Sequence, residues 1–221
     1  VFTSVYCVVD GFFVSNFAGK TAFAAINLIM PFIMILGGIG FMIGTGGSAL
    51  VSYTLGTGDK EKANRYFSMM VYFTILAGIL LTVLGIIFVR PIAELFGADE
   101  SMMDTCVLYG RIVIAFNAAF MLQNIFQSFF VVAEKPRLGL IVTIAAGVTN
   151  MVLDALFVGV FKWGIVGAAL ATGISQSIGG LLPLLYFALP NNSPLQLTRT
   201  GFELAPLLKA SSNGCSELMS N

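Results

Sequence analysis

The chain has 221 residues, of which 57% are hydrophobic and 10% are charged, and its 11 basic and 11 acidic residues give a net charge of zero. Ordinary soluble domains carry roughly 25% charged residues, so this composition excludes that class. The neutral balance excludes a nucleic-acid partner, which requires a basic face, and the absence of histidine excludes catalysis or metal binding through imidazole.

Long apolar blocks follow one another along the chain, and about 20 such residues cross a bilayer as a helix. We therefore expect an all-α membrane protein with a six-helix transmembrane bundle. The predicted spans lie at about 1–17, 26–53, 67–89, 107–132, 138–161 and 165–189. The first begins at Val1 without an initiator methionine, and a seventh segment that opens near Glu203 is still helix-like at Asn221. We expect the chain to be clipped at both ends.

The basic residues orient the predicted bundle. An even number of spans places both ends on one side, and placing them in the cytoplasm satisfies the positive-inside rule. The cytoplasmic residues would be Lys60, Lys62, Arg65, Lys135, Arg137, Arg199 and Lys209, against Lys20, Arg90, Arg111 and Lys162 outside. The amino terminus is accordingly predicted to be cytoplasmic.

The second span is rich in glycine after Pro31, with Gly37, Gly38, Gly40 and Gly44 among six glycines up to residue 47. Small residues at four-residue spacing let helix backbones approach each other closely. The alternative is a deformable helix in a protein that changes shape, with freed backbone groups satisfied by neighbouring helices or by water.

Two acidic residues, Asp10 and Asp154, lie inside predicted spans, whereas the other carboxylates fall in connectors or near span ends. A carboxylate in hydrocarbon is costly unless it is protonated, paired or hydrated, which makes both residues functional candidates that face the bundle interior. The alternative is a neutral carboxylic acid that only joins two helices by hydrogen bonding.

The predicted spans bring further oxygen ligands to the depth of these carboxylates. Asp10 and Asp154 each lie seven residues from the outer end of their spans, about 10 Å along a helix. Thr172 lies equally deep in the sixth span, and Asn150 is one turn from Asp154. No basic residue lies at this depth, so the cluster would bind a proton or a small hard cation such as sodium.

Other polar residues in the spans carry a weaker signal. Tyr6 is one turn from Asp10, and the fourth span holds the amides of Gln123, Asn124 and Gln127. Each alone is more typical of a hydrogen bond between helices than of a ligand. Together they predict one hydrated pocket inside the bundle.

Four motifs give the chain a family resemblance. They are VDGFFV at 9–14, MIGTGGSA at 42–49, LGTGD at 55–59 followed by Asn64 and Arg65, and LFGA at 95–98. In order and spacing they resemble the prokaryotic multidrug and toxic compound extrusion (MATE) family, over essentially the whole chain.

The resemblance implies a fold of two six-helix lobes related by pseudo-two-fold symmetry, with a cavity between them that opens alternately to the two sides of the membrane. Residues 1–189 would form the first lobe, 190–202 a cytoplasmic linker, and 203–221 the start of the second lobe. The partners implied are the lipid bilayer of the plasma membrane and the missing carboxy-terminal lobe.

Proteins of this family export cationic, amphipathic drugs and dyes in exchange for protons or sodium, so the resemblance implies a transporter and no enzyme, with no cofactor besides the coupling ion. The family's first-lobe cation site falls on Asp10, Asn150, Asp154 and Thr172. Tyr6 and Asn124 match positions around it, and Gln127 is placed in the same supporting pocket. Glu217 resembles an acidic residue that some members use for drug or cation binding.

Two other functions stay open. An intramembrane aspartic protease also uses two carboxylates in spans, but its glycine-aspartate signature is missing, because glycine follows Asp10 and Leu153 precedes Asp154. A lipid-linked oligosaccharide flippase of the same superfamily would line its cavity with basic residues, and this chain has none deep in a span. The fragment by itself is expected to be inactive, since half a transporter lacks the opposing wall of the cavity.

Overall fold

The computed structural model describes residues 2–190, 194–197 and 213, with only the backbone described for residues 2, 3, 6 and 7. The described part of the chain is helical and contains no β-strand, as predicted. Its elements are α1 (Phe2–Phe13), the π-helical turn η1 (Val14–Ala18), α2 (Lys20–Gly56), α3 (Lys60–Leu95), α4 (Glu100–Ala115), α5 (Asn117–Val132), α6 (Pro136–Asp154), the π-helical turn η2 (Ala155–Val160) and α7 (Ile165–Ala188).

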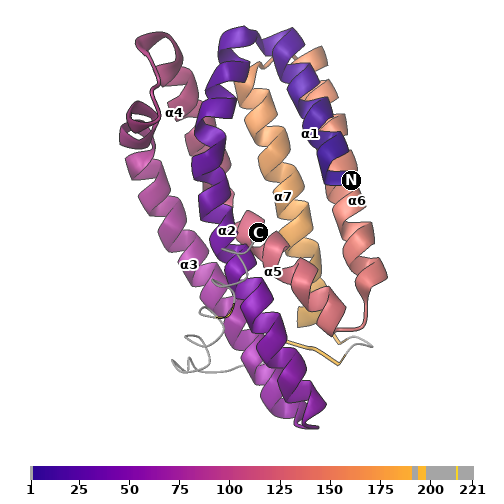
Figure 1. Ribbon diagram of the computed structural model, residues 1–221. Helices are drawn as coiled ribbons and strands as arrows, with labels where there is room; N and C mark the ends of the chain where they lie inside the picture. Colours follow the sequence, from indigo (N-terminus) through magenta and orange to yellow (C-terminus); the bar gives the residue numbers. More distant parts are fainter. Residues whose placement is uncertain (1, 191–193, 198–212, 214–221) are drawn as a thin grey trace.

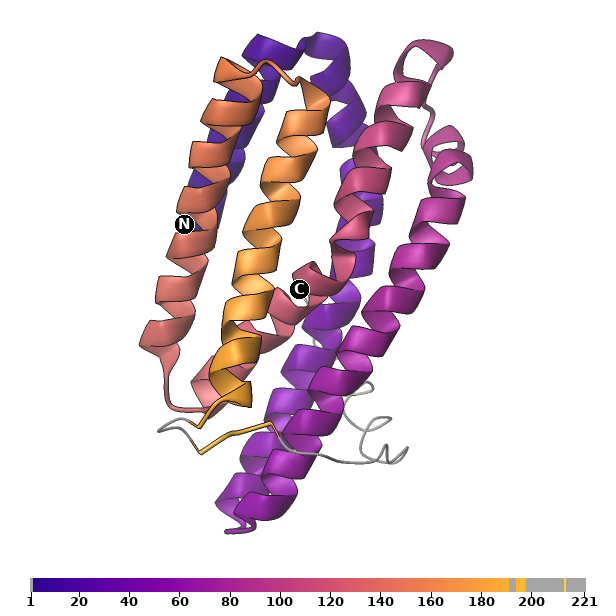
Figure 2. The ribbon, with the colours of Figure 1, turned by 180° about the vertical axis from the view of Figure 1, so that it is seen from behind.

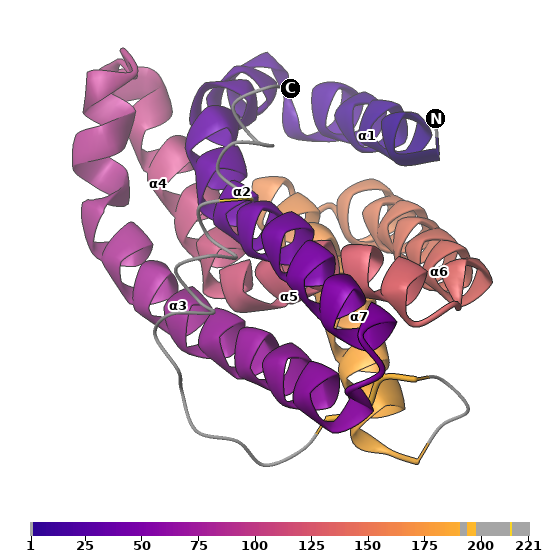
Figure 3. The ribbon, with the colours of Figure 1, turned by 60° about the horizontal axis from the view of Figure 1, so that its bottom comes forward.

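The helices form an elongated bundle (Figure 1). At one side α1 packs against α6, and at the other α3 packs against α4 (Figure 3). The central helices are α2, α5 and α7, and α5 contacts α2, α3 and α7. Seen from behind, α6 and α7 run side by side, and the chain bends sharply where α4 meets α5 (Figure 2).

Within the described residues, four helices are long and apolar enough to cross a membrane, namely α2, α3, α6 with η2, and α7. The bent pair of α4 and α5 makes a fifth if it forms one span. In the first predicted span the described apolar segment is shorter, Val8–Ala18. The chain is therefore a multi-pass membrane protein, and the count of six spans stays a prediction.

The helices that contain the second and third predicted spans extend beyond them at both ends. The observed α2 has 37 residues and α3 has 36, so each is about 55 Å long at the helical rise, against a hydrocarbon core of about 30 Å. Hydropathy marks only the part of a helix that suits lipid, whereas the helix ends where the backbone turns. Here the turns come at Gly58 and Gly97, whose φ angles are 87° and 92°, a conformation that glycine adopts without steric cost.

The fourth predicted span, 107–132, was wrong as a single straight helix. The structure begins α4 at Glu100 and breaks the pair at Phe116, where the two axes differ by 53°. Neither proline nor glycine lies at the break. The ring of Phe116 instead fills the space beside Gly173 of α7, where any Cβ would collide with it. Tertiary packing therefore holds the bend.

The glycines of α2 serve close packing against α5. A Cβ on Gly40 would lie 2.7 Å from the Cα of Met121, and one on Gly44 would lie 2.9 Å from the Cα of Ile125. Between these contacts, the amide of Asn124 donates a hydrogen bond to the Gly37 carbonyl at 3.0 Å. These contacts support the packing interpretation of the glycine-rich segment.

Part of the predicted linker packs onto the bundle. The side chain of Leu195 is fully buried in an apolar cluster that includes Phe187. The Leu197 amide donates to the Phe187 carbonyl at 2.9 Å, and the Gln196 amide donates to the Asn64 side chain at 3.0 Å. Of the predicted seventh helix only residue 213 is described, so that helix and Glu217 lie outside the described residues.

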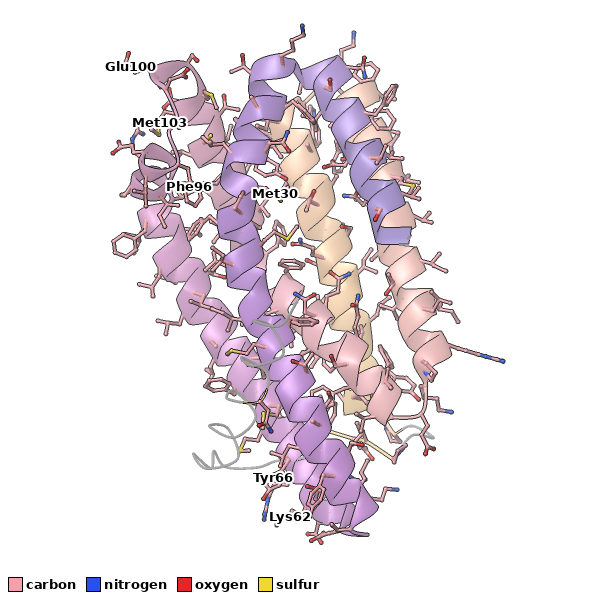
Figure 4. The ribbon with its side chains drawn as sticks, viewed as in Figure 1. Met30, Lys62, Tyr66, Phe96, Glu100 and Met103 are labelled. Atoms are coloured by element: carbon pink, nitrogen blue, oxygen red, sulfur yellow. The ribbon has the colours of Figure 1, made fainter. Side chains whose placement is uncertain are left out.

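The two ends of the bundle carry different charged residues. Lys62 and Tyr66, at the start of α3, lie at the end opposite Phe96, Glu100 and Met103, which surround the α3–α4 turn (Figure 4). The described cations at the first end are Lys60, Lys62, Arg65, Lys135 and Arg137, and those at or toward the other are Lys20, Arg90, Arg111 and Lys162. The predicted orientation, with the first end in the cytoplasm, depends on this distribution of basic residues.

Asp99 caps the start of α4. Its carboxylate accepts hydrogen bonds from the Ser101 hydroxyl at 2.6 Å and from the Met102 amide at 3.0 Å, and these bonds, that of Ser101 first, hold its pKa below the ordinary value of 3.8. Because the pKa is lowered in the folded state, the stabilisation is present at neutral pH and is lost as the pH falls through the folded-state pKa, below 3.8.

We expect Asp99→Ala to lower the thermal unfolding temperature of the purified protein at pH 7, because two donors at the helix start lose their acceptor. The difference from wild type should shrink when the same measurement is made below pH 3.8. A difference that is independent of pH would contradict the role of the ionised carboxylate.

Candidate functional site

The carboxyl groups of Asp10 and Asp154 come together inside the bundle. Asp154, the last residue of α6, is fully buried. Asp10 lies on α1, which packs along α6, and the two carboxyl groups are close enough to interact. Among the described residues, no group donates a hydrogen bond to Oδ1 of Asp10 or to either oxygen of Asp154.

The backbone changes its winding just beyond both carboxylates. After Asp10, α1 passes into the π-helical turn η1, and α6 passes into η2 directly after Asp154. The two turns contact each other, which places the two helices at a common level. Single π-helical turns are rare and occur frequently at functional sites.

A cavity of about 100 Å³ lies beside Asp10. It is bordered by Asp10 from α1, Asn150 from α6 and Thr172 from α7, so three of the four predicted site residues share it. Asp154 does not line it and is connected to it through its interaction with Asp10. The other residues around it are Met30, Met34, Tyr109, Phe120, Gln123, Ala146, Gly147, Ser175 and Gln176. Met30 reaches it from the side of α2 that faces α7 (Figure 4).

The cavity presents oxygen acceptors without donors. Asn150 is 2% exposed. Among the described residues, neither its Oδ1 nor the buried Oε1 of Gln176 has a hydrogen-bond partner. Leaving such atoms unsatisfied costs about 1–3 kcal/mol each. A cation or water would satisfy them, and the volume suffices for several water-sized groups because one needs about 10–15 Å³.

The described residues contain no group of three or more histidine, cysteine, aspartate or glutamate side chains that could hold a metal ion. A cation in this cavity would instead have one carboxylate, from Asp10, with amide and hydroxyl oxygens around it. Oxygen ligands of this kind suit hard cations, and two neighbouring carboxyl groups also suit a proton.

The predicted supporting residues are not gathered at the cavity. Asn124 donates to the Gly37 carbonyl, and Gln127 donates to the Thr143 hydroxyl at 3.5 Å. Asn124 points about 100° away from Gln123 around α5. Gln127 lies one turn beyond Gln123 along the helix axis. The backbone of Tyr6 belongs to α1, but its side chain lies outside the described part of the structure.

Sequence reasoning missed Gln176, Ser175 and Tyr109 as lining residues. A signal was available for Gln176, because it follows Thr172 by four positions and therefore shares its helix face. Ser175 is already engaged, since its hydroxyl donates to the Thr172 carbonyl at 2.8 Å.

A second cavity, of about 460 Å³, lies between α1 and α2. Its wall is mainly apolar, and Asp10, Met30 and Met34 border both cavities. The remaining lining residues are Val8, Gly11, Val14, Phe23, Ile26 and Asn27. Drug-sized molecules occupy cavities of about 300–1,000 Å³, so this second cavity, unlike the small one beside Asp10, has the volume for one.

Known proteins resemble this chain in sequence. It is 27% identical to the multidrug export protein MepA of Staphylococcus saprophyticus over 183 residues, 83% of this chain and 41% of that protein. MepA of Staphylococcus haemolyticus is 25% identical over 86% of this chain and 42% of its own length. The chain thus spans less than half the length of these curated relatives.

Solved structures share the fold. A crystal structure of MATE in the bent conformation matches 99% of this chain and 49% of its own, with a TM-score of 0.91 and 20% identity. An inward-facing multidrug resistance MATE family transporter of the MOP superfamily matches 100% of this chain and 50% of its own, with a TM-score of 0.91 and 21% identity.

The sequence pattern of the MatE family matches residues 1–156. The family consists of transporters, which confirms the prediction of a protein that is not an enzyme. Because the match covers most of the chain, the chain belongs to the MatE family, as its motifs predicted.

Proposed function

We propose that this chain is the first lobe of a secondary active transporter that exports cationic, amphipathic compounds in exchange for protons or sodium. The observation that carries the proposal is the position of Asp10, which borders both a small cavity lined in part by amide and hydroxyl side chains and a larger cavity lined mainly by apolar ones. The names of the curated relatives, which are multidrug export proteins, support the direction and the substrate class.

The two cavities differ in volume and in the side chains that line them, and each suits a different ligand. The cavity of about 100 Å³ suits a coupling ion, held by Asp10, Asn150 and Thr172 with Asp154 behind them. The cavity of about 460 Å³ suits the apolar body of a drug whose positive charge approaches Asp10. Ion and drug would therefore compete for one carboxylate.

This competition supplies a mechanism of antiport. With Asp10 and Asp154 ionised, the lobe would accept a cationic drug from the cytoplasmic side. A proton or sodium ion that enters from outside would neutralise the carboxylates and release the drug. The exchange becomes directional if the inward-open and outward-open states differ in their affinity for the two ligands.

A second lobe would complete the cavity. The solved structures that share the fold are about twice as long as this chain, which supports a further lobe in the complete transporter. In this proposal residues 1–189 form the first lobe, 190–202 the linker, and the second lobe begins at 203. The cationic end with Lys60, Lys62 and Arg65 would face the cytoplasm of the plasma membrane by the positive-inside rule.

The lipid-linked flippase is the less favoured function. Such a transporter needs basic side chains for a pyrophosphate group. The described lining of both cavities has a carboxylate and amides, and no lysine or arginine.

The proposal is tested with the complete transporter reconstituted in liposomes loaded with ethidium. We expect an opposing gradient of protons or sodium to speed ethidium release at least about fivefold, the lower end of typical coupling between two ligands. Collapse of both gradients with ionophores should remove this acceleration, and protein-free liposomes provide the baseline. Release that ignores both gradients would contradict antiport.

A further inference from the structure

We propose that Gln176 is a further ligand of the coupling cation, through its side-chain carbonyl oxygen, and that it adapts the small cavity to sodium rather than to a bare proton. The inference rests on the proposed function. It adds Gln176 to the ligands of the coupling ion and identifies that ion as sodium.

Gln176 belongs to a polar face of α7 that borders the cavity. Thr172, Ser175 and Gln176 line it from successive turns. The Ser175 hydroxyl donates a hydrogen bond to the Thr172 carbonyl of its own helix. The Oε1 atom of Gln176, in contrast, is buried and has no hydrogen-bond partner among the described residues.

The Gln123 side chain of α5 meets α7 one turn beyond Gln176. A Cβ on Gly179 would lie 2.7 Å from Cδ of Gln123, so the Gln123 side chain packs directly on this glycine. Gln123 and Gln176 both border the cavity, from α5 and α7. Gln176 therefore lies at the same cavity as Asp10 and Asn150.

The chemistry of the unpartnered atoms distinguishes the two coupling ions. A proton needs only a carboxylate oxygen, and it would leave the carbonyl oxygens of Asn150 and Gln176 without a donor. A sodium ion is a hard cation that takes several oxygen ligands at once. Asp10, Asn150, Thr172 and Gln176 bring such oxygens to one cavity from three helices, which is the arrangement that a sodium ion uses.

The test compares sodium binding and transport in the complete transporter and in Gln176→Leu. We expect binding of radioactive sodium to the purified variant to weaken about tenfold or more, the loss typical when a residue that supports a metal site is removed. Sodium-driven ethidium efflux should fall with it, and it should fall by a larger factor than proton-driven efflux measured in sodium-free buffer. Gln127→Leu, which removes an amide outside the cavity, is the matched control and should leave both unchanged.

A conservative variant keeps the test valid if leucine disturbs folding. Gln176→Glu retains a side-chain oxygen and should bind sodium at least as well as wild type. Wild-type sodium affinity in Gln176→Leu would overturn the inference, as would equal loss of sodium-driven and proton-driven efflux in both variants. Proton-driven efflux by a wild type that binds no sodium would overturn the inference and leave the proposed function intact. Failure of the wild type with either ion would overturn the proposed function.

Discussion

Replacing Asp10 or Asp154 with asparagine is expected to abolish ion-coupled efflux, so that the remaining efflux no longer responds to a proton or sodium gradient. Asparagine preserves the size of the side chain and removes its charge. In Asp10→Asn the small cavity would hold only neutral oxygens and would attract neither the cation nor the charged end of a drug. Asp154 does not touch the cavity, so the same loss in Asp154→Asn would show that the two carboxyl groups act as a pair.

The measurement is ethidium efflux from cells that express the complete transporter, normalised to the amount of protein in the membrane. Asp104→Asn is the matched control, because the side chain of Asp104 is 92% exposed and only meets Arg90 at 3.8 Å. Normal efflux in both Asp10→Asn and Asp154→Asn would reduce these carboxyl groups to hydrogen-bonding contacts between helices and would remove the proposed mechanism.

Gly40→Ala is expected to destabilise the bundle strongly, although alanine is the better helix former. The added methyl group would lie 2.7 Å from the Cα of Met121 and 2.8 Å from its carbonyl oxygen. Backbone atoms cannot rotate away as a side chain can, so α2 and α5 would have to separate. Overpacking of this kind typically costs about 1–3 kcal/mol, which exceeds the gain of about 1 kcal/mol in helix propensity.

Gly38→Ala provides the comparison, because a Cβ on Gly38 meets no atom within 4 Å. We expect this variant to be as stable as wild type, or slightly more stable. Thermal unfolding of the two purified variants in the same detergent gives the difference. Equal unfolding temperatures would show that the close approach of α2 and α5 is not needed for stability.

Hydropathy and the position of each residue along its helix predicted the helices and several residues of the candidate site. Apolar blocks located the helices, since the bilayer requires about 20 such residues wherever a helix crosses it. Counting residues from the ends of those blocks put Asp10, Asp154 and Thr172 at one level, with Asn150 one turn from Asp154. Of these four residues, Asp10, Asn150 and Thr172 border one cavity in the structure. The family motifs were equally local, because they are short runs of residues that are read directly from the chain.

Neither property predicts which side chains of a helix point toward the cavity. Asn124 and Gln127 had the same polarity as Gln123, yet only Gln123 reaches the cavity, while the others bond to Gly37 and Thr143. The rotation of α5, which follows from its contacts with α2 and α7, separates Asn124 from Gln123. Gln127 shares the helix face of Gln123, but it lies one turn further along, beyond the cavity.

The sequence alone therefore determined the class of the protein and the approximate positions of its apolar helices, and it predicted a depth for the buried carboxyl groups, because each depends on residue type and on distance along the chain. The tertiary structure decided the bend at Phe116, the π-helical turns beyond Asp10 and Asp154, and the inclusion of Gln176 in the cavity wall. These features depend on contacts between residues far apart in the chain, such as Phe116 on Gly173, and no local pattern of residues contains them.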